Sequence, residues 1–337
     1  MNKFFAIIIA AIMSTTYVFA ISSTKCKNEC MVNRFMNLNK NSDWKLIKKI
    51  TLQFPSYHVQ GMVKIGKYFY ISSARITEKS ERLKDSDYGY DRTPGKGVGY
   101  LFKFDINGKL IDKITLGIKD CYHPGGIDFD GKYIWVPVSE YRPNSRSIIY
   151  RVDPTTMKAE EIFRFGDHIG TISYNPETGI LYGSSWGSRR WYAWKLKPEN
   201  YLNQSKKEFN IPPYTMKLNS EHYIDYQDTH FIPGHYILCG GLNVYPIKNT
   251  GDTALKIHTE KNIGNVAFGG IDLVDTNTLE PVFQLPVNLR IAPQLVMTNN
   301  PFYFECGIKS ITFYFVPQSD AVTKDNGGVD MYIYTVQ

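Results

Sequence analysis

The 337-residue sequence has the balance of an ordinary globular protein, with 43% hydrophobic and 21% charged residues, which excludes a disordered chain. Its 24 tyrosines, 19 phenylalanines and 26 glycines favour many short strands joined by tight turns and exclude a long coiled coil. The net charge of +7 is spread along the chain without a block of like charges, so we expect no nucleic-acid partner.

Residues 1–20 predict a signal peptide. Lys3 precedes an apolar run over residues 4–13, and residues 18–20 end in the small-residue pattern of a cleavage site. The apolar run is too short to span a membrane comfortably, so we expect a secreted or periplasmic protein without stable membrane insertion. A retained N-terminal anchor is the alternative. Residues 21–43 then form an N-terminal segment ahead of the folded domain.

All five cysteines follow the predicted cleavage site, and an odd number allows at most two disulfides. Cys26 and Cys30 are spaced to bridge locally or to tie the N-terminal segment to the domain. Cys121, Cys239 and Cys306 lie in or beside apolar strand-like runs, which predicts that they are buried. The sequence leaves the pairing open.

From residue 58 onward the sequence repeats a unit of four strands, in which a polar start precedes an apolar strand and an aromatic second strand. The five copies begin at His58, His123, His168, Tyr226 and Ala292. The third copy has a weak fourth strand near residues 208–209. The fifth copy begins with residues 292–295, continues through 302–305 and 330–334, and then ends.

Residues 44–51 have the alternation of the fourth strand that the fifth copy lacks, although they precede the first copy. This predicts an all-β, five-bladed β-propeller over residues 44–337, a single domain whose ring is closed by the N-terminal strand. Six blades are the alternative.

The first strand of each propeller blade starts on one face of the ring, near its axis. We therefore expect the histidines of three consecutive copies to converge there, joined by polar residues of other strands. The predicted members are His58, Gln60, His123, His168, Gln227, Asp228 and Gln294.

His123 and His168 are candidate catalytic acids or bases. Three imidazoles around one axis are also suited to a divalent metal, which we do not favour because the other two copies supply no good soft-metal ligands. The structural alternative is that each histidine caps its own blade by hydrogen bonding to neighbouring backbone.

Two loops that follow second strands, at residues 139–147 and 185–191, place arginines beside aromatic rings. Arg142 and Arg189 are suited to carboxylate, phosphate or sulfate groups, and stacking on Trp186 suits a sugar. Glu140 is the best carboxylate for an acid or base role, with Asp228 second. The alternative for Glu140 is an ion pair with a neighbouring arginine.

The segments HPGGIDFDG at residues 123–131, SEYRPNSRS at 139–147 and SWGSRR at 185–190 resemble an uncharacterised family of secreted, propeller-like proteins of bacteria and fungi. The resemblance is densest over residues 120–195 and looser across 55–315. It implies the fold and secretion, and it implies no established reaction.

The leading functional hypothesis is a secreted, monomeric propeller that binds a small polar or anionic molecule at the mouth of its channel, with lyase or hydrolase chemistry left open. The alternative is a non-enzymatic scaffold that presents its loops, above all residues 243–269, to a protein or polysaccharide partner.

Overall fold

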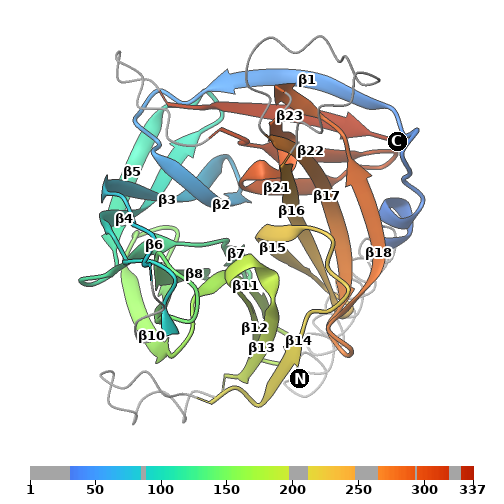
Figure 1. Cartoon of the computed structure of the whole chain (residues 1–337). Coiled ribbons are helices and arrows are strands. Elements are labelled where there is room, and N and C mark those ends of the chain that lie inside the picture. The colour runs from blue at the N-terminus through green and yellow to red at the C-terminus, as the bar shows by residue number, and fades with distance from the viewer. Residues whose placement is uncertain (1–30, 85–88, 197–211, 247–264, 293, 319–327) are drawn as a thin grey trace, which may run out of the picture.

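The computed structural model describes residues 31–84, 89–196, 212–246, 265–292, 294–318 and 328–337. Five small antiparallel sheets stand around one axis as the blades of a five-bladed β-propeller, which confirms the predicted architecture and blade number (Figure 1). The innermost strands surround the centre of the ring, so the residues at their starts lie close together across different blades.

The blades follow one another in chain order. Blade one contains β2 (His58–Ile65), β3 (Tyr68–Glu78), β4 (Lys96–Asp105) and β5 (Leu110–Leu116). Blade two contains β6 (Cys121–Pro124), β7 (Asp128–Phe129), β8 (Ile134–Glu140), β9 (Ser147–Val152) and β10 (Ala159–Phe165). Blade three contains β11 (Ile169–Asn175), β12 (Ile180–Ser185), β13 (Arg190–Lys195) and β14 (Thr215–Leu218). Blade four contains β15 (Asp225–Ile232), β16 (Tyr236–Pro246), β17 (Asn265–Asp275) and β18 (Glu280–Val287).

Blade five joins the two ends of the chain. Its strands are β21 (Phe302–Cys306), β22 (Ile311–Phe315), β23 (Asp330–Val336) and β1 (Trp44–Thr51). β1 pairs antiparallel with β23, with Trp44 opposite Val336 and Thr51 opposite Asp330. This confirms the predicted closure, in which the N-terminal strand completes the last sheet and the ring cannot open without breaking that pairing.

One strand prediction was wrong, and another lies outside the described residues. The innermost strand of blade five was expected at residues 292–295. Instead β19 (Arg290–Ala292) and β20 (Leu295–Val296) pair as a separate small sheet. The innermost strand is β21, which begins at the fully buried Phe302. The fourth strand of blade three is β14, and the predicted residues 208–209 lie outside the described residues.

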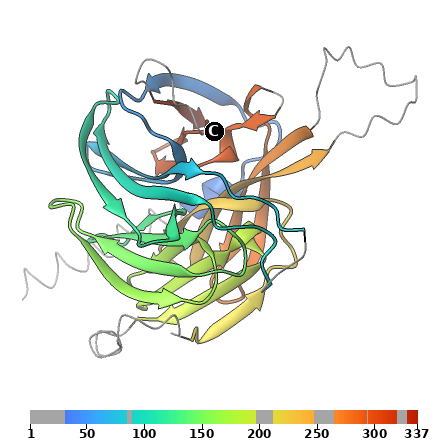
Figure 2. The same cartoon turned by 60° about the vertical axis from the view of Figure 1, so that its left-hand side comes forward.

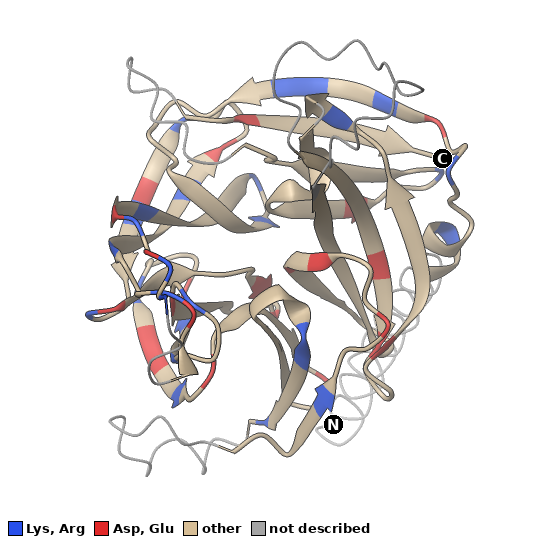
Figure 3. Cartoon of the chain, viewed as in Figure 1, with Lys and Arg blue, Asp and Glu red and all other residues tan. Residues whose placement is uncertain are grey.

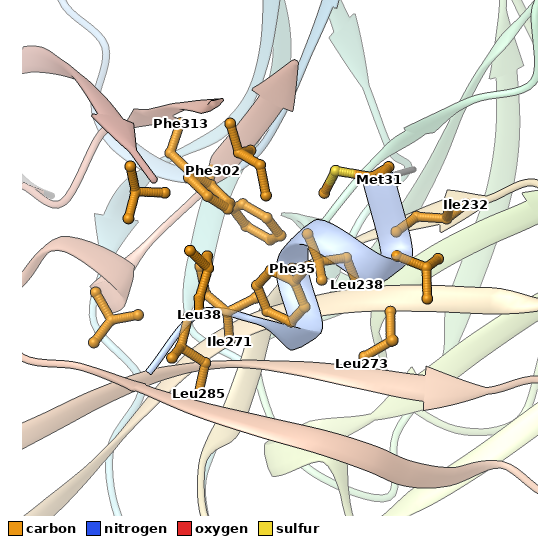
Figure 4. Packing of buried hydrophobic residues seen from close by; sticks show 14 of the residues in the cluster. Met31, Phe35, Leu38, Ile232, Leu238, Ile271, Leu273, Leu285, Phe302 and Phe313 are labelled. Carbon is orange, nitrogen blue, oxygen red and sulfur yellow. The ribbon is translucent and has the colours of Figure 1, made fainter. Parts of the chain in front are cut away.

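Part of the N-terminal segment packs on the propeller. Residues 31–36 form a short helix whose apolar side chains Met31 and Phe35 are buried against blades four and five, as is Leu38 (Figure 4). The ring of Phe35 meets that of Phe283 edge to face, with centroids 5.5 Å apart. Burying such side chains stabilises this contact by about 1.5–3 kcal/mol each.

The cysteine prediction is confirmed in two of three positions. Cys121 and Cys239 are buried, whereas Cys306 is exposed at the end of β21, where its thiol accepts a hydrogen bond from Arg34. The predicted signal peptide and both N-terminal cysteines lie outside the described residues.

In Figure 3, Lys and Arg and Asp and Glu are both scattered around the ring, and most strands carry few charged residues. Within the described ranges, no helix is long and apolar enough to cross a membrane. β16 and β17 continue outward past the ring as a paired arm (Figure 2), which leaves Val244, Tyr245 and Phe268 about half exposed.

Candidate functional site

A buried polar network fills the centre of the ring. Asp228, on the innermost strand β15, is fully buried, and its carboxylate accepts the backbone N–H groups of Met62, Ile127 and Thr229 at 2.9–3.1 Å. Those residues belong to blades one, two and four, so one side chain links three blades.

His230 lies two residues further along β15 and continues the network. Its Nε2 donates to the carbonyl oxygen of Phe302 in blade five at 2.7 Å and lies 3.6 Å from the carboxylate of Asp228. Its Nδ1 lies 3.6 Å from the carboxylate of Asp128, which also accepts the N–H groups of Tyr174 and Phe231. All five blades therefore meet in one set of polar contacts.

Burial and charge act against each other in this network. Burial raises the pKa of Asp228 to about 7, while His230 and the three N–H groups favour its ionised form. Burial also lowers the pKa of His230, but the two neighbouring carboxylates outweigh this effect and leave the pKa raised. Burial also raises the pKa of Asp128, so the two carboxylates favour the charged form of His230 while burial disfavours their own.

A pocket of about 480 Å³ opens at one mouth of the channel. On strands β2, β11 and β15, the residues that line the pocket precede in the chain the residues of the polar network. Because these strands begin at the channel mouth, the network lies beneath the pocket and forms its base. The pocket brings together the three predicted histidines, with ring centroids 5.3 Å apart for His58 and His123 and 6.2 Å apart for His123 and His168. Its other aromatic and polar lining comes from Gln60, Tyr141, Trp186, Asp225, Tyr226, Gln227, Asn243, Asn299 and Asn300.

His123 has an unusual place in this pocket. His123 is 3% exposed, and its ring stacks on the ring of Tyr141 with centroids 4.2 Å apart. Neither ring nitrogen has a hydrogen-bond partner among the residues that the structure describes. Burial, reinforced by His58 and His168, holds the pKa of His123 well below its usual value, so the ring is a neutral donor and acceptor.

His168 presents a fixed tautomer. Its Nδ1 donates to the backbone carbonyl of Glu140 at 2.8 Å, which leaves Nε2 as an acceptor. Burial lowers the pKa of this imidazole to about 4. His58 is held by the side-chain amide of Gln60, whose nitrogen lies 3.0 Å from its Nε2. Both contacts orient rings of the pocket wall.

Glu140 and Arg142 lie outside the pocket lining. The Glu140 side chain is 1% exposed, and its two oxygens accept from Arg142 at 2.7 Å and from Arg146 at 2.8 Å. Arg142 in turn lies 3.6 Å from the centre of the Tyr90 ring. The carboxylate thus forms the arginine ion pair that the sequence left as its alternative role.

Glu140→Gln is expected to lower the free energy of unfolding by about 1–3 kcal/mol, because a largely buried Arg142 loses its counter-ion. Ligand affinity should stay within twofold. Chemical denaturation measures the first quantity, and Glu160→Gln, at a half-exposed ion pair with Arg151, is the matched control with an effect of about 0–1 kcal/mol. Unchanged stability with lost ligand binding would instead place Glu140 in the site.

The remaining predicted site residues do not all lie in the pocket. Trp186 and Gln227 line the pocket, and Asp228 lies beneath it in the network. Arg189 lies beside the pocket, ion-paired with Asp225 at 2.6 Å. Gln294 was misplaced, because it lies exposed between β19 and β20 and not at the start of an innermost strand.

The donor set gives no indication of a metal. Over the described part of the chain, no group of three or more histidine, cysteine, aspartate or glutamate side chains is arranged to hold a metal ion.

Residues 19–334 match a family of unknown function, DUF6454. The chain belongs to this family. Its membership of an uncharacterised family with a propeller-like fold is therefore confirmed, and family membership brings no activity with it. No functionally curated protein matches the sequence.

Several solved structures are similar to this DUF6454 chain in fold, at low sequence identity. A luciferin-regenerating enzyme is 8% identical, with 88% of this chain and 95% of that chain covered and a TM-score of 0.45. MPT-4, a mannose phosphorylase from Leishmania mexicana, is 10% identical, with 94% and 92% covered and a TM-score of 0.46. The Malassezia sympodialis allergen Mala s 1 is 11% identical, with 84% and 78% covered and a TM-score of 0.41. At these values the similarities carry no argument about function.

Sequence reasoning missed His230, Asp128 and Tyr141 in this family member. The i, i+2 spacing of Asp228 and His230 on a predicted innermost strand places both side chains toward the axis, which is a usable signal. Tyr141 lies between Glu140 and Arg142, and its stacking on His123 depends on a contact that the spacing does not reveal.

Proposed function

We propose that this DUF6454 protein binds a small, neutral, hydroxyl-rich ligand, of the class and size of a monosaccharide, in the pocket at the channel mouth. The observation that carries the proposal is His123. A buried polar group without a hydrogen-bond partner destabilises a fold by about 1–3 kcal/mol. A ligand hydroxyl, which both donates and accepts, would satisfy either ring nitrogen.

The charge balance favours a neutral ligand over an anionic one. The arginines on the two loops nearest the pocket are each within ion-pair distance of a carboxylate: Arg142 and Arg146 with Glu140, Arg189 with Asp225, and Arg190 with Asp167. His123 and His168 are held neutral by burial. The four arginines exceed these three carboxylates by one charge, because Arg142 and Arg146 share Glu140, but neither of those two arginines lines the pocket. The two arginines beside the pocket, Arg189 and Arg190, each have a carboxylate of their own, so an anion gains little there.

The remaining lining supports a sugar. Tyr141 and Trp186 provide aromatic planes with centroids 5.5 Å apart, and sugar rings stack their apolar C–H faces on such planes. The amides of Gln227, Asn243 and Asn300 add donors and acceptors around these planes. Polar groups placed around aromatic rings in a concave pocket are typical of small-ligand sites.

The same pKa shifts favour binding without turnover. A general base works best when its pKa lies near the working pH, and the pKa of His168 is about 4. Glu140, a further predicted catalytic residue, has both oxygens occupied by arginines. Asp228 has a pKa raised by burial to about 7, but it is fully buried beneath the pocket and its carboxylate is occupied by three backbone N–H groups. We therefore assign the histidines to recognition.

The test is a calorimetric titration of the protein with glucose, mannose, galactose and N-acetylglucosamine, compared with glucose 6-phosphate and glucuronate. At least one neutral sugar is expected to bind, and at 100 times its dissociation constant to stabilise the fold by about 2.7 kcal/mol in thermal unfolding. Preference for the anionic compounds, or no binding of any neutral sugar, would overturn the proposal.

Residues 1–20 support the further proposal that this binding takes place outside the cytoplasm. Recovery of the uncleaved protein from the cytoplasmic fraction would contradict it. The scaffold alternative stays a prediction, since residues 247–264 of its main loop lie outside the described residues.

A further inference from the structure

A second hollow of about 250 Å³ adjoins the pocket at the channel mouth. Ser185, Trp186, Gly187 and Asp225 line both, so the two spaces share one wall. Beyond that wall the hollow is formed by the side chains of Pro143, Asn144, Asp167, Arg189 and Arg190.

We propose that this hollow is a second subsite of the same site, and that the ligand is a linear oligosaccharide with one unit in the axial pocket and the next beyond Trp186. The inference rests on the proposed function and names its ligand more closely.

The shared wall suits a chain that continues from one space into the other. Gly187 has a left-handed backbone, with φ 59°, and lacks a side chain between the two spaces. A Cβ there would lie in van der Waals contact with Arg189 and Asp225, 3.4 Å from each, and would add bulk to the shared wall. The ring of Trp186 stays in place because His168 contacts it edge to face, at 4.8 Å, and Arg92 lies 5.0 Å from its centre.

The polar groups of the second hollow match hydroxyls. Two arginines balance two aspartates there, through the pairs Arg189–Asp225 at 2.6 Å and Arg190–Asp167 at 3.2 Å. Arg190 also donates to the side-chain oxygen of Asn144 at 3.1 Å. Carboxylate oxygens and guanidinium N–H groups that are already ordered by one another can bind neighbouring hydroxyls at little further entropic cost.

Asn144 offers a clean test of this subsite. It is exposed, lines only the second hollow and has φ 52°, a conformation that glycine adopts freely, so Asn144→Gly removes one polar group without backbone strain. Asn277→Gly, at an exposed turn between β17 and β18, is the matched control.

The measurement is calorimetric affinity for one-, two- and three-unit oligosaccharides of the gluco, manno, galacto and N-acetylglucosamine series. In the series that binds, the three-unit sugar is expected to bind about tenfold more tightly than the single unit. Asn144→Gly should remove about two- to fivefold of that gain and leave the single-unit affinity unchanged. Asn277→Gly should leave the single-unit and the three-unit affinities unchanged.

The outcomes separate the two proposals. Equal affinity for one and three units would overturn the second subsite and leave the proposed function standing. Equal loss of single- and three-unit binding in Asn144→Gly would also overturn the separate subsite. Absence of binding by every neutral sugar would overturn both.

Discussion

Asp228→Ala is expected to lower the free energy of unfolding by about 3–5 kcal/mol. The substitution leaves three buried backbone N–H groups, from Met62, Ile127 and Thr229, without their acceptor, and it removes one of the two carboxylates that face His230. Because these groups belong to different blades, the loss falls on the contacts that hold the blades together at the axis. Urea unfolding followed by tryptophan fluorescence measures it.

Asp112→Ala is the matched control, since Asp112 is exposed on the outer strand β5 and, within the described ranges, accepts only the N–H of Lys113. Its effect should stay within about 0.5 kcal/mol. Asp228→Asn should fall between the two, because the amide keeps one acceptor oxygen. If Asp228→Ala lost less than about 1 kcal/mol, the axial network would not be a principal contact between blades.

His123→Phe is expected to separate stability from binding. The substitution keeps an aromatic ring to stack on Tyr141 and removes two buried nitrogens that have no hydrogen-bond partner among the described residues. The free energy of unfolding should therefore stay unchanged or rise by about 1 kcal/mol. Affinity for the neutral sugar that binds should fall by about 10- to 100-fold, because the ligand loses its buried hydrogen bonds.

The same substitution at His230 is the sharpest comparison. His230 lies between two carboxylates and donates to the carbonyl of Phe302, so His230→Phe should destabilise the fold by about 3–5 kcal/mol. A lower free energy of unfolding in His230→Phe, with an unchanged or higher one in His123→Phe, would show that only His230 stabilises the fold. Loss of stability in His123→Phe with unchanged sugar binding would contradict the proposed role of His123.

The fold was predictable because its signals are periodic. Strand alternation recurs in every blade, and the displaced strand at residues 44–51 identified both the closure and the ring. Position along a repeat also predicted that residues near the starts of innermost strands, such as His58 and His123, would meet. That inference needs only the symmetry of the fold and no knowledge of side-chain contacts.

The errors arise where the repeat is irregular. The fifth copy was expected to begin an innermost strand at Ala292, but Ala292 ends β19, which pairs with β20, so the predicted axial place of Gln294 was wrong. The sequence left two roles open for Glu140, an ion pair with arginine and an acid or base in catalysis. The ion pair forms because residues 140–146 fold back and bring two arginines to one carboxylate, and sequence spacing does not reveal this fold. Likewise the network of His230 depends on contacts across four other blades.

The buried axial network has a consequence for how a polymer could engage this protein. Asp228 and His230 are 0% and 2% exposed, so the ring is sealed at its centre. If the proposed oligosaccharide binds, it therefore cannot thread through the ring, and the unit in the axial pocket would be the end of a chain whose remainder runs outward past Trp186. On that proposal the site selects chain ends over chain interiors, and a bound molecule has to leave before the next can bind.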